Sequence, residues 1–255
     1  PPQPPPDQTQ PPPAQPPPAQ PPPAGDAAQP AQPAGDAAAA AKEEPKWYDS
    51  FKIDAFADGY VGINFNFPRP QGPSGNGAGG NSFRAYDVNN GFTLHWIGLN
   101  VGYAPDPVGG TIGLRFGPSA TIYGGPDNEH GLENVKQAFL TLKPGGADGQ
   151  FTLDFGKFDT IVGAEVADSQ FNMNYTRGVL YWYAQPLFHT GFKAEYAFVP
   201  EFAARAMLVN GYNNTVDNNA GKTGGVQLVI KPTDKFAAYL GYLFGPEQAD
   251  TTTLE

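Results

Sequence analysis

The residues with the most evident chemical potential gather in an insert at 159–178, which separates two stretches of alternating polar and apolar residues. The insert contains three carboxylates and one guanidinium, and charged or imidazole side chains flank it. The set is Asp159, Glu165, Asp168 and Arg177 within the insert, and Lys157, His189, Lys193 and Glu195 beside it. Acidic and basic groups facing each other across a narrow passage create a transverse field at reduced dielectric, which orients dipolar solutes. The residue types therefore predict selection of solutes in a constriction, not catalysis.

The composition of the insert bears on whether it is packed or solvated. Apolar residues alternate with its charges, as expected of a loop folded against other parts of the protein. These apolar residues are Ile161, Val162, Val166, Phe171 and Met173. We therefore expect the insert to narrow a lumen, with Asp159, Glu165 and Asp168 on an acidic side and Arg177 with Lys157 or Lys193 on a basic side. The alternative is an external loop whose charges only keep it solvated.

The remaining polar residues do not form a recognisable catalytic or metal-binding motif. His95 and His130 are far from His189 in the sequence and lack nearby acidic partners, so His189 is expected to line a polar lumen instead. The sequence has no GxSxG, HExxH or P-loop motif. Asp127, Glu129 and Glu133 do not have EF-hand spacing and are expected in a solvated loop. The run NNTVDNN at 213–219 is expected to serve turn geometry. No cofactor, metal or enzymatic activity is predicted.

Composition narrows the classes of protein that fit. The 255 residues include no cysteine, 32 glycines and 13% aromatic residues, so disulfide scaffolds and thiolate metal sites are excluded. The net charge of −10 argues against a nucleic-acid partner. No run approaches the roughly 18 apolar residues of a spanning helix, but a spanning strand needs only about 9–11 residues, half of them apolar.

The elements that must position the insert are β-strands. Apolar residues occupy every second position over long stretches, most clearly at the odd positions of 51–67. Ten strands are predicted: 51–67, 92–103 with a bulge near Trp96 and Ile97, 111–122, 135–143, 150–158, 179–185, 188–198, 202–210, 224–231 and 235–244. Short turns alternate with long loops, including a glycine-rich loop at 68–82, which is typical of an outer-membrane barrel. The chain ends in TTTLE, and we expect further strands to be needed for closure.

Residues 1–46 differ in composition from residues 47–255. They hold 17 of the 29 prolines, which favours polyproline II and prevents formation of a core. This segment is predicted to be a disordered periplasmic linker, either contacting the cell wall or without a partner. The chain starts at Pro1 and shows no signal peptide, so an export signal is expected to have been removed.

Four sequence blocks carry a resemblance that extends beyond periodicity. These are GKFDTIVGAEV from Gly156, NMNYTRG from Asn172, AQPLFHTGF from Ala184 and NGYNNTVDNNAGKT from Asn210. In order and spacing they resemble the OmpL-like outer-membrane β-barrel porins, and the similarity runs from about Tyr48 to the C-terminus. The resemblance implies an outer-membrane channel of a Gram-negative-type bacterium, without enzymatic activity. Members of the family tend to be longer than this chain.

Together these observations predict an all-β, antiparallel transmembrane β-barrel at 47–255. It would allow passive diffusion of small hydrophilic solutes or ions, with outer-membrane lipid as its surroundings and homo-oligomerisation left open. One alternative is a non-conducting structural protein that the proline-rich segment tethers to the cell wall. The other is a soluble β-sandwich that binds glycans, which would need a second sheet against the apolar strand faces.

Overall fold

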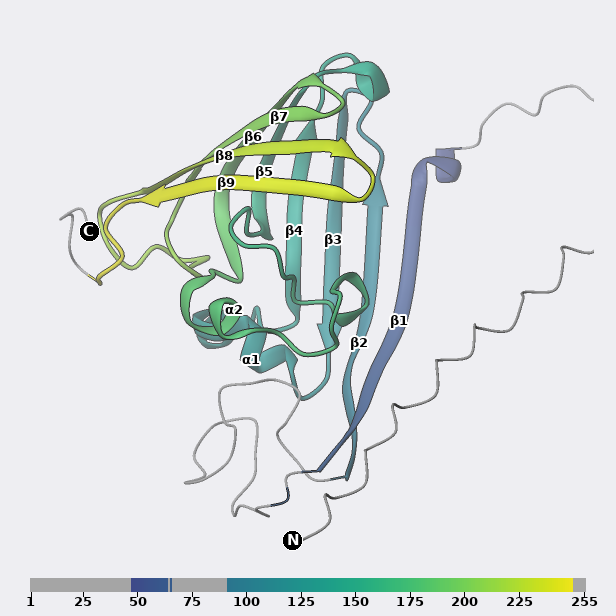
Figure 1. The fold of residues 1–255 in the computed structure, drawn as a ribbon, viewed down its shortest axis with the longest axis vertical. Helices are drawn as coiled ribbons and strands as arrows, with labels where there is room; N and C mark the ends of the chain where they lie inside the picture. The colour runs from purple at the N-terminus through teal and green to yellow at the C-terminus, as the bar shows by residue number, and fades with distance from the viewer. Residues whose placement is uncertain (1–46, 64, 66–90, 250–255) are drawn as a thin grey trace, which may run out of the picture. The chain divides into compact units, whose positions relative to one another are not determined.

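The computed structural model describes residues 47–63, 65 and 91–249, and within them nine strands form one antiparallel sheet in the order β1 to β9 (Figure 1). The strands are β1 (Phe51–Gly62), β2 (Gly91–Tyr103), β3 (Val108–Phe116), β4 (Val135–Leu142), β5 (Phe151–Asp159), β6 (Phe188–Val199), β7 (Phe202–Val209), β8 (Thr223–Thr233) and β9 (Phe236–Phe244). Each strand pairs with its neighbour in sequence. The all-β antiparallel class is thus confirmed. The predicted linker at 1–46 and the glycine-rich loop at 68–82 lie outside the described residues.

Connections of two very different lengths join the strands. Short turns link β2 to β3, β4 to β5, β6 to β7 and β8 to β9, whereas long segments link β3 to β4, β5 to β6 and β7 to β8. The long segments contain α1 (Ala120–Gly124) and α2 (Val179–Ala184), and the short 3-10 turns Gly125–His130 and Ser169–Phe171. A 3-10 turn at Trp47–Ser50 precedes β1, and another at Gly146–Asp148 lies in the β4–β5 turn. Both sets of connections follow the predicted alternation.

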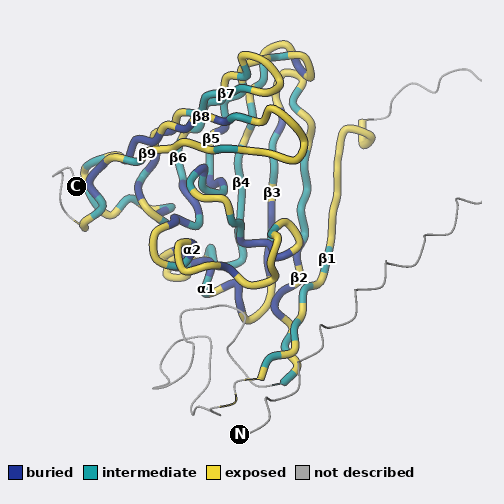
Figure 2. The backbone as a smooth tube through the Cα atoms, in the orientation of Figure 1, coloured by how far each residue is buried: buried dark blue, intermediate teal, exposed yellow. Residues whose placement is uncertain are grey.

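The two faces of the sheet differ in chemistry. One face, here called the outer face, presents an apolar side chain that is at least 41% exposed from every strand. One such residue per strand, from β1 to β9, is Ile53, Phe92, Ile112, Leu140, Phe155, Phe192, Leu208, Leu228 and Leu240. Among the described residues no second sheet covers this face, which removes the β-sandwich alternative. Buried segments lie mainly where the strands meet the insert (Figure 2).

Exposed aromatic residues mark both ends of the strands. At the short-turn end, Trp47 packs edge-on against Tyr48 and Phe51, and the Phe51 ring lies 5.0 Å from that of Tyr103. The same end carries exposed Phe151, Tyr196, Phe198 and Phe236. At the long-loop end, the exposed aromatic residues are Phe92, Phe116 and Phe244. The outer face is therefore bounded by aromatic side chains along both rims.

Two glycines with unusual backbone conformations oppose each other in the middle of the sheet. Gly156 of β5 and Gly191 of β6 are register partners with φ of +136° and +154°, a backbone region that side-chain-bearing residues rarely adopt. A Cβ on Gly191 would lie 2.7 Å from the Cα of Val209. Between this glycine pair and the long-loop end the exposure no longer alternates, since Phe158, Phe188 and His189 are all buried. Phe188 is therefore buried, although it lies an even number of residues from the exposed Phe192.

Two predicted strands need correction, and one predicted bulge is confirmed. Residues 179–184 of the strand predicted at 179–185 form the helix α2 instead, because VLYWYA is a continuous apolar run whose pattern fits a buried strand and a helix equally. The strand predicted at 111–122 ends at Phe116, because Gly117, with φ of +146°, turns the chain before α1. The register shifts where Asp58 pairs with Trp96 and Gly59 with Leu94, one residue from the predicted bulge.

Candidate functional site

The insert lies against the face of the sheet opposite the outer face, here called the inner face, and reaches across several strands. Figure 1 shows the sheet curling so that β8 and β9 cross in front of β3 and β4, with α1 and α2 below them at the long-loop end of the strands. The Ser169 hydroxyl donates to Asp58 of β1 at 2.9 Å, and Gln227 of β8 donates to the Ile161 carbonyl. The insert is therefore held at both ends of the described sheet.

Two buried apolar clusters pack the insert against the inner face. Trp96 and Tyr123 pack with Ala167 of the insert and Tyr181 of α2, and Phe56, Ile122, Trp182 and Leu187 surround them. Phe158, Met207 and Val209 pack with Ile161, beside Phe139, Val162 and Leu243. The apolar residues predicted to pack the insert divide accordingly. Ile161 and Val162 are packed, whereas Phe171 and Met173 are exposed.

Asp168 is the principal polar anchor of the insert. Its carboxylate accepts two hydrogen bonds from Arg115 of β3, at 2.9 and 2.8 Å, and Lys136 Nζ lies 3.4 Å away. Both members of the Arg115–Asp168 pair are almost completely buried. Burial raises the pKa of Asp168, but the hydrogen bond from Arg115 and the charge of Lys136 outweigh burial and hold that pKa below its ordinary value. Asp159 pairs with the same lysine.

Arg177 and Glu165 organise the insert internally. The Arg177 guanidinium is buried and donates to the carbonyls of Val166, Ala167 and Tyr175 and to the Ser169 hydroxyl. Both carboxylate oxygens of Glu165 accept from the Gly178 amide, at 2.9 and 3.0 Å, directly before α2. The guanidinium and the carboxylate therefore shape the loop through hydrogen bonds to its own backbone.

Lys157 and Asp127 form a second buried pair beside the insert. Lys157 Nζ lies 2.6 Å from Asp127 Oδ2, and the amide and hydroxyl of Thr215 also donate to this carboxylate. The Lys157 ammonium lies 3.9 Å from the centre of the Phe188 ring, within cation–π range. Asp127 is 0% exposed, so the prediction that it belongs to a solvated loop is wrong, since it neutralises a buried lysine.

His189 is also buried, and this contradicts its predicted place on an open lumen. Its Nε2 lies 2.9 Å from the Thr160 hydroxyl, and its Nδ1 lies 3.0 Å from the Gly211 carbonyl. Both ring nitrogens are thus used to join β6 to the two adjoining loops.

The described residues contain no group of three His, Cys, Asp or Glu side chains placed to hold a metal ion. Asn213 lies in the run at 213–219 that was predicted to serve turn geometry, and it adopts φ of +62°. Its side-chain oxygen accepts hydrogen bonds from the backbone amides of Leu187 and Phe188.

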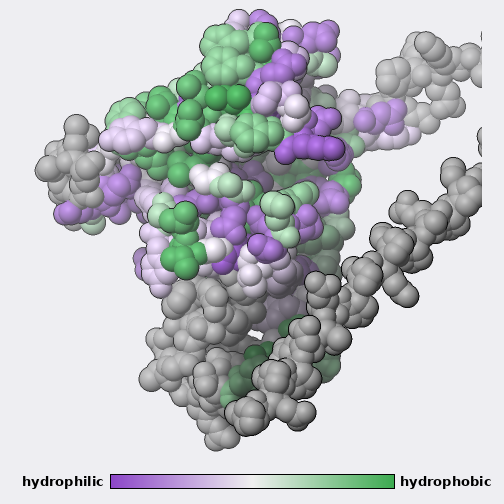
Figure 3. Space-filling view, viewed as in Figure 1, coloured by the Kyte–Doolittle hydropathy of each residue, from purple (hydrophilic) through white to green (hydrophobic). Residues whose placement is uncertain are grey.

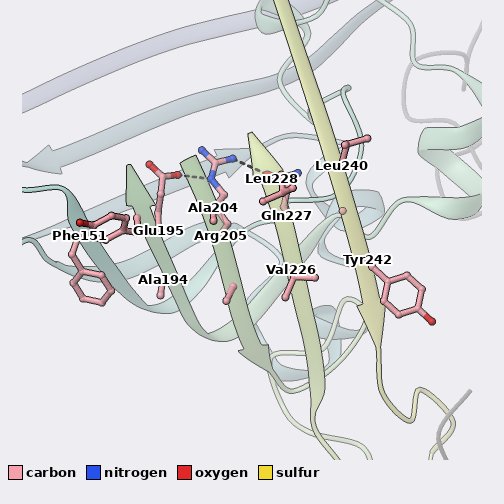
Figure 4. Close-up of a pocket in the computed structure, with 13 residues that line it drawn as sticks. Phe151, Ala194, Glu195, Ala204, Arg205, Val226, Gln227, Leu228, Leu240 and Tyr242 are labelled. Atoms are coloured by element: carbon pink, nitrogen blue, oxygen red, sulfur yellow. Dashed lines mark hydrogen bonds and ion pairs between the residues drawn. The ribbon is translucent and has the colours of Figure 1, made fainter. Parts of the chain in front are cut away.

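Away from the insert, the inner face of β5 to β8 carries two ion pairs, of which Glu195–Arg205 is partly exposed and Lys193–Asp154 has a buried carboxylate. Lys193 and Asp154 are register partners with Nζ and Oδ2 3.1 Å apart. Glu195 and Arg205 are register partners on β6 and β7, and Arg205 also donates to Gln227 of β8 at 3.1 Å. Figure 4 shows this row on one side of the strands, with Ala194 and Val226 pointing to the other side.

A groove of about 750 Å³ lies on the outer face of the same strands (Figure 4). Small side chains of β6 and β7 form its floor, and bulky apolar side chains form its walls. The floor is Ala194, Ala204 and Ala206, and the walls include Phe151, Tyr196, Val226, Leu228, Leu240 and Tyr242. Strands β6, β7 and β8 therefore present linked polar side chains on the inner face and an apolar groove on the outer face.

The structure brings all eight predicted residues to the inner face or the adjoining loops, but it pairs their charges locally. The described residues do not show the expected separation into an acidic and a basic side. Sequence reasoning did not identify Arg115, Lys136 and Asp58 as partners of the insert. Arg115 did carry a signal, because it lies on the polar side of an alternating strand.

Comparison with known proteins gives one match. The family model "Putative beta-barrel porin-2, OmpL-like" covers residues 50–254, which include every strand described above. Neither the curated proteins nor the solved structures contain a match to this chain. None of the helices among the described residues is long and apolar enough to cross a membrane. By its family match and its all-β antiparallel fold, the chain belongs to the OmpL-like β-barrel porin family.

Proposed function

We propose that the protein is an outer-membrane channel through which small hydrophilic solutes or ions diffuse passively, along an inner face narrowed by the insert at 159–178. The observation that carries the proposal is the segregation of the two faces. Exposed apolar side chains occur on the outer face of every strand, while the inner face carries ion pairs and the insert. An apolar exterior around a polar interior is the arrangement of a transmembrane β-barrel.

The aromatic residues at both ends of the strands support placement in a bilayer. Aromatic side chains favour the boundary between hydrocarbon and headgroups, and barrels of the outer membrane carry such girdles on both sides. Outer-membrane lipid then covers the apolar face and its groove. Contact of residues 1–46 with the cell wall and self-association into a homo-oligomer are further proposals that depend on this placement.

Under this proposal the protein needs no chemical step, since the fold supplies the wall and the side chains supply the selectivity. The ion pairs on β5 to β8 are locally neutral, so a passing solute meets alternating charges without a strong net field. A neutral, polar solute is then accepted as well as an ion, and conduction depends mainly on the width left beside the insert.

Planar-bilayer recording of the full-length protein tests the proposal. We expect stepwise insertions whose conductance rises with salt concentration. A protein that inserts into the bilayer but passes no current contradicts the channel and favours the non-conducting structural alternative.

A charge substitution tests whether the inner-face pairs line the pathway. In Glu195→Gln the Arg205 guanidinium loses its carboxylate on a partly exposed wall, so we expect the reversal potential in a salt gradient to shift toward anion preference. The matched control is Asp217→Asn, which removes a carboxylate from an ion pair in the loop between β7 and β8. Equal reversal potentials for Glu195→Gln and the unchanged protein would remove these pairs from the pathway.

A further inference from the structure

The insert and the following helix α2 expose an unusual amount of apolar surface for segments on a polar face. Five large side chains in one short stretch are between 67% and 104% exposed. They are Phe171, Met173, Val179, Leu180 and Tyr183. Exposed apolar surface gathered in this way usually marks a contact site. In Figure 3, green patches lie over the region that α2 and the adjoining insert occupy in Figure 1. This surface is here called the apolar patch.

The patch faces the space bounded by the inner face and not the surroundings of the outer face. The residues that fasten the insert belong to the inner face: Asp58 of β1 binds Ser169, Arg115 of β3 binds Asp168, and Gln227 of β8 binds the chain at residue 161. The buried side of the insert packs on the same face through the clusters described above. Hydrocarbon that covers the outer face therefore lies on the opposite side of the sheet from the patch.

Helix α2 holds part of the patch in a fixed orientation. Tyr181 is 2% exposed and packs among Trp96 and Tyr123, which leaves the opposite side of this short helix to Val179, Leu180 and Tyr183. Hydrogen bonds to Glu165 secure both ends, since its carboxylate accepts the Gly178 amide and its carbonyl accepts the Gln185 side chain. The apolar side chains are thus held outward, although turning them inward would remove them from water.

We propose that the apolar patch contacts the apolar part of amphipathic solutes as they pass along the inner face. The solute class is small molecules with an aliphatic or aromatic body and a polar or zwitterionic group. This inference rests on the proposed channel function and specifies its solutes. Because the wall charges are neutralised in pairs, apolar contact is the main attraction that distinguishes one solute of a given size from another. Such contact favours entry and remains weak enough for exit.

Leucine and asparagine are suitable probes, because they share the zwitterionic group and have similar size but differ in the polarity of the side chain. Proteoliposomes containing the full chain are diluted into each solute, and the swelling rate is corrected with protein-free liposomes. If contact with the patch removes apolar surface equal to one methylene group of leucine from water, leucine is favoured over asparagine by roughly fourfold. We therefore expect leucine to enter about fourfold faster than asparagine.

The test variant is Met173→Gln/Val179→Thr/Leu180→Gln, which keeps side-chain size while making the patch polar. The matched control is Asn174→Ser, an exposed polar position in the same segment. Heat-modifiable migration in gels verifies that both variants are folded. We expect the leucine preference to fall close to one in the triple variant and to stay unchanged in the control.

The outcomes separate this inference from the function on which it rests. Entry of both solutes without a leucine preference, or a preference that survives in the folded triple variant, overturns the apolar patch as a contact site and leaves the channel intact. Entry of neither solute overturns the channel together with the inference. If the triple variant does not fold, Leu180→Gln alone is measured, and an unchanged preference in that variant refutes the assignment.

Discussion

Asp168→Asn should release the insert from the sheet at a large cost in stability. The substitution leaves the Arg115 guanidinium, which is 2% exposed, without its ionic partner. Breaking a buried ion pair by removing one member costs roughly 3–5 kcal/mol. Arg115 keeps hydrogen bonds to the Asn100 side chain at 2.9 Å and the Leu114 carbonyl at 2.7 Å. We therefore expect the lower end of this range, about 3 kcal/mol of unfolding free energy.

Urea unfolding in detergent, followed by tryptophan fluorescence, measures this cost. Trp96 is fully buried and its ring lies 5.6 Å from the Arg115 guanidinium carbon, so its emission reports on the anchor. The control Asp217→Asn alters the partly exposed pair with Lys222 and should cost less than about 1 kcal/mol. The double variant Arg115→Met/Asp168→Leu, which removes both charges, should recover most of the loss.

Two results would refute this reasoning. If Asp168→Asn costs no more than the control, the pair does not hold the insert. If the double variant is as unstable as Asp168→Asn, the loss comes from packing and not from an unpaired charge. Release of the insert should also make single-channel current noisier, which bilayer recordings of the same variant would detect.

Two further predictions concern the glycine pair of β5 and β6 and the dependence of stability on pH. Gly191→Ala should cost at least about 1–3 kcal/mol or abolish folding, because φ of +154° is strained for alanine and the new Cβ would meet the Val209 backbone. Gly102→Ala, whose nearest neighbouring atom would be 4.0 Å away, should have little effect in the same urea assay. The lowered pKa of Asp168 contributes stability that is fully present above about pH 4, the unfolded value, and is lost as pH falls through the folded value. Urea midpoints should therefore decline below about pH 4 more steeply in the unchanged protein than in Asp168→Asn, and parallel declines would contradict this contribution.

The strands could be predicted because a strand with one apolar face records its orientation in every second residue. The hairpins of β4 with β5, β6 with β7 and β8 with β9 have partners only a few residues away along the chain. In these strands the apolar residues at every second position lie on the outer face. In β6 this alternation of exposure ends at Gly191, because the backbone there adopts a positive φ. Helix α2 was missed because its uninterrupted apolar run suits a buried strand and a helix equally.

The charges of the insert show where sequence reasoning ends. The sequence by itself determined that carboxylates and cations would gather near 159–178, because residue types and periodicity are local properties. Only the tertiary structure decided which charge meets which, since Arg115 and Asp168 are 53 positions apart and become neighbours through the curl of the sheet and the path of the insert. Burying a charged side chain is costly unless an oppositely charged group pairs with it, and for this reason the folded chain pairs Arg115 with Asp168. The exposed surface of the insert is left with apolar side chains.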